Sequence, residues 1–291
     1  MSSSQVSSHE TKSQKFARSF LAFALFLAIA ALSLTVCIRV YFINPDNVVK
    51  VFSNEKYVSS LREDILNYTH ETLKSNMLPE DCLDEVITYK EVHDISYAYA
   101  AGTTEAYEEY TSTSYQDYIN NLGDNIKSTI KGVISDGKLE VDENQKADGA
   151  ATFTEKVKDH IAVTVEKPYM DRLANILKIG KTATLVAIIL FALVALLLGL
   201  IVVSIGKRYR ALRYIVHSVN AAALLDLVLV TGVAVVERAK TLYIFPTYFR
   251  ASVMSYVNGC TASVAVSAVV LLLISLALTV FIWKMKKDSN G

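Results

Sequence analysis

Two groups of side chains in this sequence have chemistry suited to a functional site. The first centres on Asp226, an acid in the middle of an apolar run from Tyr214 to Val236. An ionisable group at such a depth in a bilayer costs about 2.5 to 3.5 kcal/mol and seldom faces lipid. Ser267 and Ser275 share one stripe of a later apolar run and offer hydroxyls to it. Three roles stay open for Asp226: a protonated structural acid bonded to one of these serines, a proton relay or transport site, and a contact to another membrane subunit.

The second group is a concentration of tyrosines. Six of them fall within 22 residues, mixed with glutamates: Tyr97, Tyr99, Tyr107, Tyr110, Tyr115 and Tyr118. Tyrosine rings give a rigid amphipathic surface that suits partner binding, and they equally cover small helical cores. The sequence therefore marks a candidate partner surface and leaves plain packing as the alternative.

Motifs typical of enzymes are missing from the sequence. There is no Gly-rich phosphate loop, no Ser-centred nucleophile elbow and no paired-Cys metal pattern. The histidines do not form a metal or catalytic set. We therefore expect a protein that is not an enzyme, needs no cofactor or metal, and has no nucleic-acid partner.

Four apolar stretches must position these groups. They run 20, 25, 23 and 33 residues: Ser19 to Ile38, Thr182 to Gly206, Tyr214 to Val236, and Ala251 to Trp283. About 20 helical residues cross the roughly 30 Å of bilayer hydrocarbon. The sequence therefore predicts an all-α membrane protein rather than a soluble enzyme. We place the four transmembrane helices at residues 19–41, 181–206, 214–236 and 260–283, with a short outer loop at 237–259.

The first span could also be read as a cleavable signal, because a basic start precedes an apolar run. No small-x-small cleavage pattern follows it, and Val36 precedes Cys37 where lipoprotein processing requires a small residue. Arg39, Tyr41 and Phe42 instead form the interfacial border of a retained helix. We therefore expect the first span to stay in the membrane.

Charge is unevenly distributed although 29 basic and 29 acidic residues cancel over the chain. Residues 43–179 hold 14 basic and 25 acidic side chains, whereas ten basic residues flank the other ends of the spans. Basic flanks are retained on the cytoplasmic side. We therefore expect a plasma-membrane protein with both termini cytoplasmic, a disordered tail at 1–18, a second tail at 284–291, and an acidic extracytoplasmic domain at 42–180 between helices 1 and 2.

Three cysteines are present: Cys37, Cys82 and Cys260. Only Cys82 lies within the acidic domain, so no internal disulfide can stabilise that domain. Cys37 and Cys260 occur at similar depth in their spans. An interhelical disulfide and two packed thiols are both open interpretations.

Apolar spacing in the acidic domain is helical. Residues recur at three- and four-residue intervals over 55–74 and 114–135, which predicts two amphipathic helices. Further helices are expected to begin at 78–81, to span 88–101, and to cover 153–165. Residues 135–150 are polar with turn residues at both ends, which favours a loop or a hairpin around 138–141. After Pro168, a helix is expected to run directly into the second span.

The chain resembles a family of uncharacterised four-span membrane proteins from Gram-positive bacteria. The resemblance rests on three segments that look like the opening of that family's outer domain: Asn54 to Leu66, Leu78 to Asp81, and Val86 to Thr88. It implies one span, a helical outer domain and three clustered spans, and it carries no site residues. The order of spans is also similar to the permease subunit of the cell-division ABC transporter complex, by topology alone.

These patterns favour a membrane protein that binds a partner or senses the envelope through its acidic outer domain. The alternative is a permease-like or transport component of a larger complex, acting through Asp226 or the basic link Lys207 to Arg213. Expected partners are the lipid bilayer and other membrane or envelope proteins.

Overall fold

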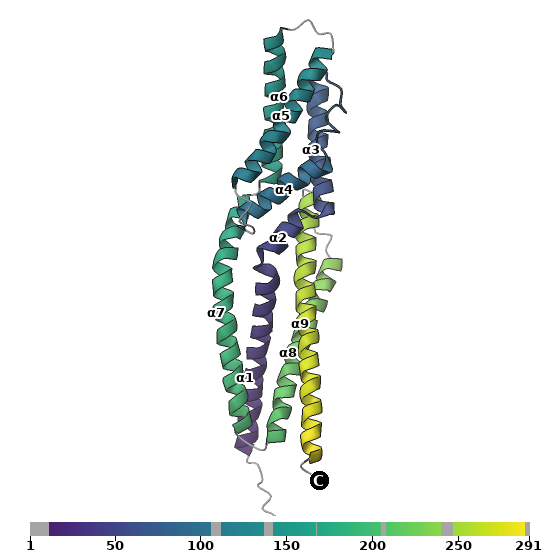
Figure 1. Cartoon of the computed structure of the whole chain (residues 1–291). Coiled ribbons are helices and arrows are strands. Elements are labelled where there is room, and N and C mark those ends of the chain that lie inside the picture. Colours follow the sequence, from purple (N-terminus) through teal and green to yellow (C-terminus); the bar gives the residue numbers. More distant parts are fainter. Residues whose placement is uncertain are drawn as a thin grey trace, which may run out of the picture. The chain divides into compact units, whose positions relative to one another are not determined.

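The chain is almost entirely helical. The computed structural model describes residues 12–105, 112–136, 142–166, 168–204, 208–239 and 247–288, and no strand occurs in these ranges (Figure 1). The prediction of an all-α protein is therefore confirmed for the described residues. The elements are α1 (Lys12–Cys37), a π-helical turn η1 (Ile38–Phe42), α2 (Pro45–Phe52), α3 (Glu55–Ser75), α4 (Tyr89–Thr103), α5 (Ser112–Asp136), α6 (Glu143–Val165), α7 (Pro168–Ser204), α8 (Arg208–Ala239) and α9 (Thr247–Asp288).

These helices form two compact units. The membrane unit comprises Met1–Phe42, Gly180–Thr241 and Gly259–Gly291, and the insert unit comprises Ile43–Ile179 and Leu242–Asn258. Helices α7 and α9 contribute residues to both units. The expected continuous helix after Pro168 is confirmed, because α7 runs without interruption to Ser204.

Four helices are long and apolar enough to cross a membrane. The candidate spans lie in α1 with η1, in α7, in α8 and in α9, with mean hydropathies of 2.7, 3.4, 1.7 and 2.8 in their most apolar windows. Their outer surfaces carry exposed leucine, valine and phenylalanine side chains, which would be unfavourable in water and suit lipid. The chain is therefore a multi-pass membrane protein.

Small side chains allow α1 and α8 to pack closely in the membrane unit. Ala28 on α1 and Ala222 and Ala223 on α8 are buried. The Ser218 hydroxyl donates a 2.7 Å hydrogen bond to the carbonyl oxygen of Ala22 on α1. Lipid tails provide no hydrophobic force between helices, so close backbone approach and interhelical hydrogen bonds hold such a pair.

The insert unit has its own hydrophobic core. Helix α5 packs on α4 and α6, and α3 packs on α4 and α6. The apolar stripe predicted for 114–135 is buried as expected, with Tyr115, Ile119, Leu122, Ile126 and Ile130 facing the core. Tyr68 on α3 stacks on His160 of α6 with ring centroids 3.8 Å apart. Burial of these faces, rather than a disulfide, stabilises the unit.

Side-chain caps fix where several of these helices begin. Asn54 accepts a 2.9 Å hydrogen bond from the Tyr57 amide at the start of α3, and Thr88 accepts a 3.2 Å bond from the Glu91 amide at the start of α4. Asn44 caps α2 in the same way, through the Asp46 amide at 3.1 Å. Each bond satisfies an amide that lacks a partner within its helix.

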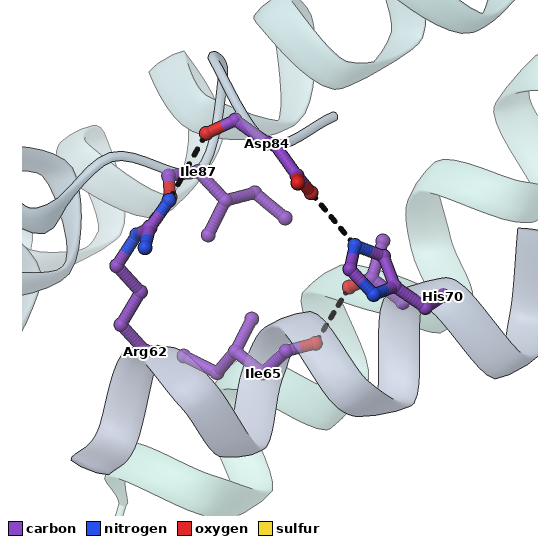
Figure 2. Close-up of polar contacts among 6 residues, drawn as sticks. Arg62, Ile65, His70, Asp84 and Ile87 are labelled. Carbon is purple, nitrogen blue, oxygen red and sulfur yellow. Dashed lines mark hydrogen bonds and ion pairs between the residues drawn. The ribbon is translucent and has the colours of Figure 1, made fainter. Parts of the chain in front are cut away.

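The helix expected to begin at residues 78–81 does not form. Residues 80–86 are consecutive turns instead. The Arg62 side chain on α3 holds this segment by donating hydrogen bonds to the carbonyl oxygens of Ile87, at 2.7 Å, and of Asp84, at 3.1 Å; the residues are drawn in Figure 2. Those oxygens are bound to a side chain rather than to downstream amides. Leu83 and Ile87, both fully buried, complete the attachment of this segment to the core.

A second polar contact holds the same segment. The His70 ring nitrogen Nε2 lies 2.7 Å from Asp84 Oδ1 (Figure 2). His70 and Arg62 thus bind the turn segment from two points along α3. Asp84, one of the acids near Cys82, thus serves as a partner within the fold.

Helices also extend further than the sequence suggested. The expected loop at 135–150 is helical from Glu143 onward, while 137–141, where a hairpin was expected, lie outside the described residues. Ala147, Ala150 and Ala151 favour helix, and Ala150 is fully buried. The tail expected at 1–18 is helical from Lys12, because hydropathy marks where a membrane begins rather than where a helix begins.

The outer loop expected at 237–259 is mostly helical as well. Helix α8 continues to Ala239 and α9 begins at Thr247. Ser252, Val253, Tyr256 and Val257 lie on one face of α9 and line an apolar cavity of about 160 Å³ in the insert unit. Packing of this face stabilises the part of α9 that precedes residue 260, where the transmembrane helix was expected to begin.

Candidate functional site

The buried carboxyl group of Asp226 lies at the meeting point of three helices in the membrane unit. The Ser33 hydroxyl of α1 donates a 2.6 Å hydrogen bond to Asp226 Oδ2 on α8. The same hydroxyl lies 2.7 Å from the Ser267 hydroxyl on α9. Because a hydroxyl carries one proton, Ser33 accepts from Ser267 when it donates to Asp226. A chain of three polar groups therefore connects α1, α8 and α9.

Helical spacing explains how α8 presents this acid. Ala222, Ala223 and Asp226 lie within about one turn and are all fully buried. The alanines leave room for neighbouring helices to approach, so the carboxyl group is shielded from lipid. The other carboxyl oxygen, Oδ1, is buried and has no hydrogen-bond partner in the part of the chain that the structure describes. That oxygen is free to accept from a proton donor not belonging to these helices.

The structure brings two of the three predicted residues, Asp226 and Ser267, into one network. Ser267 joins it through its 2.7 Å contact with the Ser33 hydroxyl. Ser275 is buried eight residues further along α9, which corresponds to about 12 Å of helix. Among the described residues the structure shows no hydrogen bond between Ser275 and Asp226, so Ser275 lies outside this network.

Ser33 is the functional candidate that sequence reasoning missed. Its signal was available: it is the first hydroxyl after an uninterrupted apolar run from Phe20 to Leu32. Thr35 nearby is equally polar, yet its hydroxyl donates to the carbonyl of Ala31 in its own helix at 2.7 Å. Only the tertiary structure shows that the Ser33 hydroxyl bonds between helices, whereas the Thr35 hydroxyl bonds within its own helix.

Cys37 lies one turn beyond Ser33. Its thiol donates a 3.6 Å hydrogen bond to the carbonyl oxygen of Ser263 on α9. Cys37, Cys82 and Cys260 are all free thiols in the structure. Of the two interpretations left open, the structure contains packed thiols rather than an interhelical disulfide.

In the insert unit, two of the predicted tyrosines come together. Tyr99 on α4 and Tyr115 on α5 have ring centroids 5.2 Å apart with planes tilted by 55°. They line a cavity of about 540 Å³ whose wall also includes Gln116, Glu166 and Asp171. The C-terminal end of α6 supplies Glu166, and the first turn of α7 supplies Asp171. The cavity is therefore aromatic on one side and acidic on the other.

The Tyr115 hydroxyl is the unusual group of this cavity. Tyr115 is 4% exposed, and its hydroxyl lies close enough to the Glu166 carboxylate to interact with it. Burial raises the pKa of this phenol above its ordinary value, and the nearby carboxylate of Glu166 raises it further.

The two other described tyrosines of the group do not line this cavity. Tyr97 stacks with His93 on the same helix at 6.0 Å, and Tyr118 packs against the core. Tyr107 and Tyr110 lie outside the described residues. Among the described residues no group of three or more His, Cys, Asp or Glu side chains is arranged to hold a metal ion.

The fold is that of a multi-pass helical membrane protein whose chain forms two compact units. No family model matches the chain, and neither the curated proteins nor the solved structures provide a match. The resemblance to the Gram-positive membrane family therefore stays a prediction from sequence.

Proposed function

We propose that this protein is a non-enzymatic plasma-membrane protein whose insert unit lies outside the cell and binds a basic group of an envelope partner. Both termini are then cytoplasmic. The cavity lined by Tyr99, Tyr115, Glu166 and Asp171 is the observation that carries the proposal.

The chemistry of the cavity supports a cationic ligand group. Aromatic faces attract ammonium and guanidinium ions, and carboxylates form charge-assisted hydrogen bonds with them. Two tyrosines and two acids line the cavity, and no basic side chain is among the lining residues that the structure describes. The excess of acidic residues in 43–179 adds long-range attraction for a basic partner.

A site-specific photocrosslinker tests this proposal in living cells. Placed at Gln116, which lines the cavity, it should give a discrete adduct with an envelope protein. Placed at Ser128, exposed on the same helix and outside the cavity lining, it should not. The Gln116 adduct should disappear when Glu166→Gln and Asp171→Asn are combined, with membrane abundance unchanged. Equal adducts at both positions, or an adduct that survives the double substitution, would refute the proposal.

A transport component is the second candidate function, and one observation favours it. Asp226 Oδ1 is buried in the membrane unit without a hydrogen-bond partner in the described ranges. Intramembrane acids with free coordination positions are typical of proton and ion pathways. The interhelical bonds through Ser33 favour the structural role instead, and substitution of Asp226 separates the two.

A further inference from the structure

The membrane unit also contains a cavity, separate from the tyrosine-lined cavity of the insert unit, that neither proposed function uses. It has a volume of about 510 Å³ and lies between the first turns of α8 and the last turns of α9. Its wall includes Arg213, His217, Trp283 and Lys286, together with two buried apolar residues, Val216 and Ile282. Both helices belong to the same unit.

Both helices contribute a cation to the cavity wall, Arg213 from α8 and Lys286 from α9. Arg213 and His217 are four residues apart and share one face of α8. Thr279, Trp283 and Lys286 follow at intervals of four and three and share one face of α9. In the part of the chain that the structure describes, no acidic side chain lines the cavity. Arg213 and Lys286 make no ion pair within the described ranges, so their charges are uncompensated there.

The position along the helices points to the membrane surface. The apolar run of α8 begins at Tyr214, directly after Arg213, and that of α9 ends at Trp283, just before Lys284. The cavity thus lies where both spans leave the hydrocarbon, at the end expected to be cytoplasmic. Trp283 is 68% exposed, and tryptophan is enriched at the level of lipid headgroups.

We propose that this cavity binds the headgroup phosphate of an anionic phospholipid. The planar guanidinium of Arg213 matches two phosphate oxygens, and the ammonium of Lys286 supplies a second positive charge. Exposed apolar side chains continue from the cavity toward the membrane centre on α9, including Val280 and Leu276, and they provide a surface for an acyl chain. A free phosphate ion would gain nothing from that surface. Basic pockets between spans are a recognised arrangement for anionic headgroups.

Native mass spectrometry of the full-length protein in detergent tests the proposal with two lipids, phosphatidylglycerol and phosphatidylcholine. We expect phosphatidylglycerol to bind at least about tenfold more tightly. Arg213→Gln and Lys286→Gln should each weaken its binding about fivefold, since each removes a charge-assisted hydrogen bond to the phosphate in the cavity. The matched control is Lys284→Gln, which removes the same charge from the same end of α9 outside the cavity lining. Because Lys284 does not contact the bound headgroup, its loss should change binding less than about twofold.

Further comparisons separate a lipid site from a free-phosphate site and from a general effect of positive charge. Both cavity cations are exposed, so their substitution should leave the melting temperature in phosphatidylcholine unchanged. Equal affinity for the two lipids would overturn the proposal, as would an equal loss in Lys284→Gln. Displacement of phosphatidylglycerol by inorganic phosphate at similar concentration would assign the cavity to free phosphate and likewise overturn the lipid site. If one variant is unstable, the other single variant provides the same comparison.

Discussion

Ser33 and Asp226, 193 residues apart in the chain, share a 2.6 Å hydrogen bond inside the membrane unit. Ser33 also contacts Ser267 at 2.7 Å. One small hydroxyl therefore links the first span to two later ones. Loss of the Ser33 hydroxyl should therefore weaken the packing of all three helices.

Substitutions at this network should separate a structural from a transport role. Asp226→Asn keeps an acceptor for Ser33, so we expect near wild-type stability. Asp226→Leu and Ser33→Ala should lower the free energy of unfolding by about 0.6 kcal/mol, and up to about 2 kcal/mol at most. Thermal unfolding in detergent and membrane abundance measure the effect. Thr231→Ala is the control, because that exposed hydroxyl bonds only to carbonyls of its own helix.

The same series has an outcome that would favour transport. A stable and abundant Asp226→Asn protein that fails to complement a deletion would show that the carboxyl group must change its charge. The structural interpretation would then be wrong.

Arg62 should be the most sensitive polar residue of the insert unit. Arg62→Ala leaves the carbonyl oxygens of Asp84 and Ile87 without their donor, and bonds from a charged group are worth about 1.5 to 3 kcal/mol. Lys74→Ala is the control, because its 3.4 Å contact with Glu80 is exposed and contributes at most about 1 kcal/mol. Chemical denaturation monitored by far-UV circular dichroism measures both. Equal effects would contradict the anchoring role of Arg62.

The Cys82 thiol should react slowly. Burial raises its pKa, and the carboxylates of Asp81 and Asp84 raise it further. Less thiolate is therefore present at pH 8 than for a free cysteine, and the thiolate is the reactive form. In a Cys37→Ala, Cys260→Ala background, alkylation by iodoacetamide should be slower than for a cysteine peptide and should accelerate in urea. Asp81→Asn should accelerate the alkylation only modestly, since burial is the larger cause of the raised pKa of Cys82.

Alkaline pH should destabilise the insert unit through Tyr115. Burial and Glu166 raise its pKa in the folded state, whereas the unfolded phenol titrates near pH 10. Above about pH 10 the unfolded state releases a proton that the folded state retains, so the free energy of unfolding falls as pH rises. The free energy of unfolding of the Tyr115→Phe variant should fall less steeply with pH. This variant should be at least as stable as the wild type at pH 7. Identical pH profiles would contradict the pKa shift.

Membrane topology is testable by cysteine labelling. In a background without native cysteines, Ser112→Cys should react with an impermeant maleimide added to intact cells, and Ser289→Cys should react only after permeabilisation. The expectation follows from the basic flanks of the spans. Labelling of both positions from outside would reverse the proposed orientation of the termini.

Apolar length and helical spacing were enough to predict the four spans and the amphipathic helices at 55–74 and 114–135. Both signals are local, because a span needs a continuous apolar run and a buried helix face needs one stripe. Local signals failed where distant groups decided the structure. Arg62 binds the carbonyls of Asp84 and Ile87 in the turn segment that stands where a helix was expected, and packing of Tyr256 and its neighbours stabilises the part of α9 that lies in the expected loop.

The candidate sites show the same division between local signals and contacts made by distant residues. Asp226 and the tyrosines stand out in the sequence because an acid in an apolar run and a dense aromatic segment are visible without any partner. The sequence could not select Ser33 over Thr35, exclude Ser275, or choose Tyr99 and Tyr115 from six tyrosines. Those choices depend on which helix faces lie within hydrogen-bond or van der Waals distance, and these forces act over a few ångströms between residues far apart in the chain. Residue types and their periodicity are properties of the sequence, whereas the pairing of Ser33 with Asp226 exists only once α1 and α8 have packed.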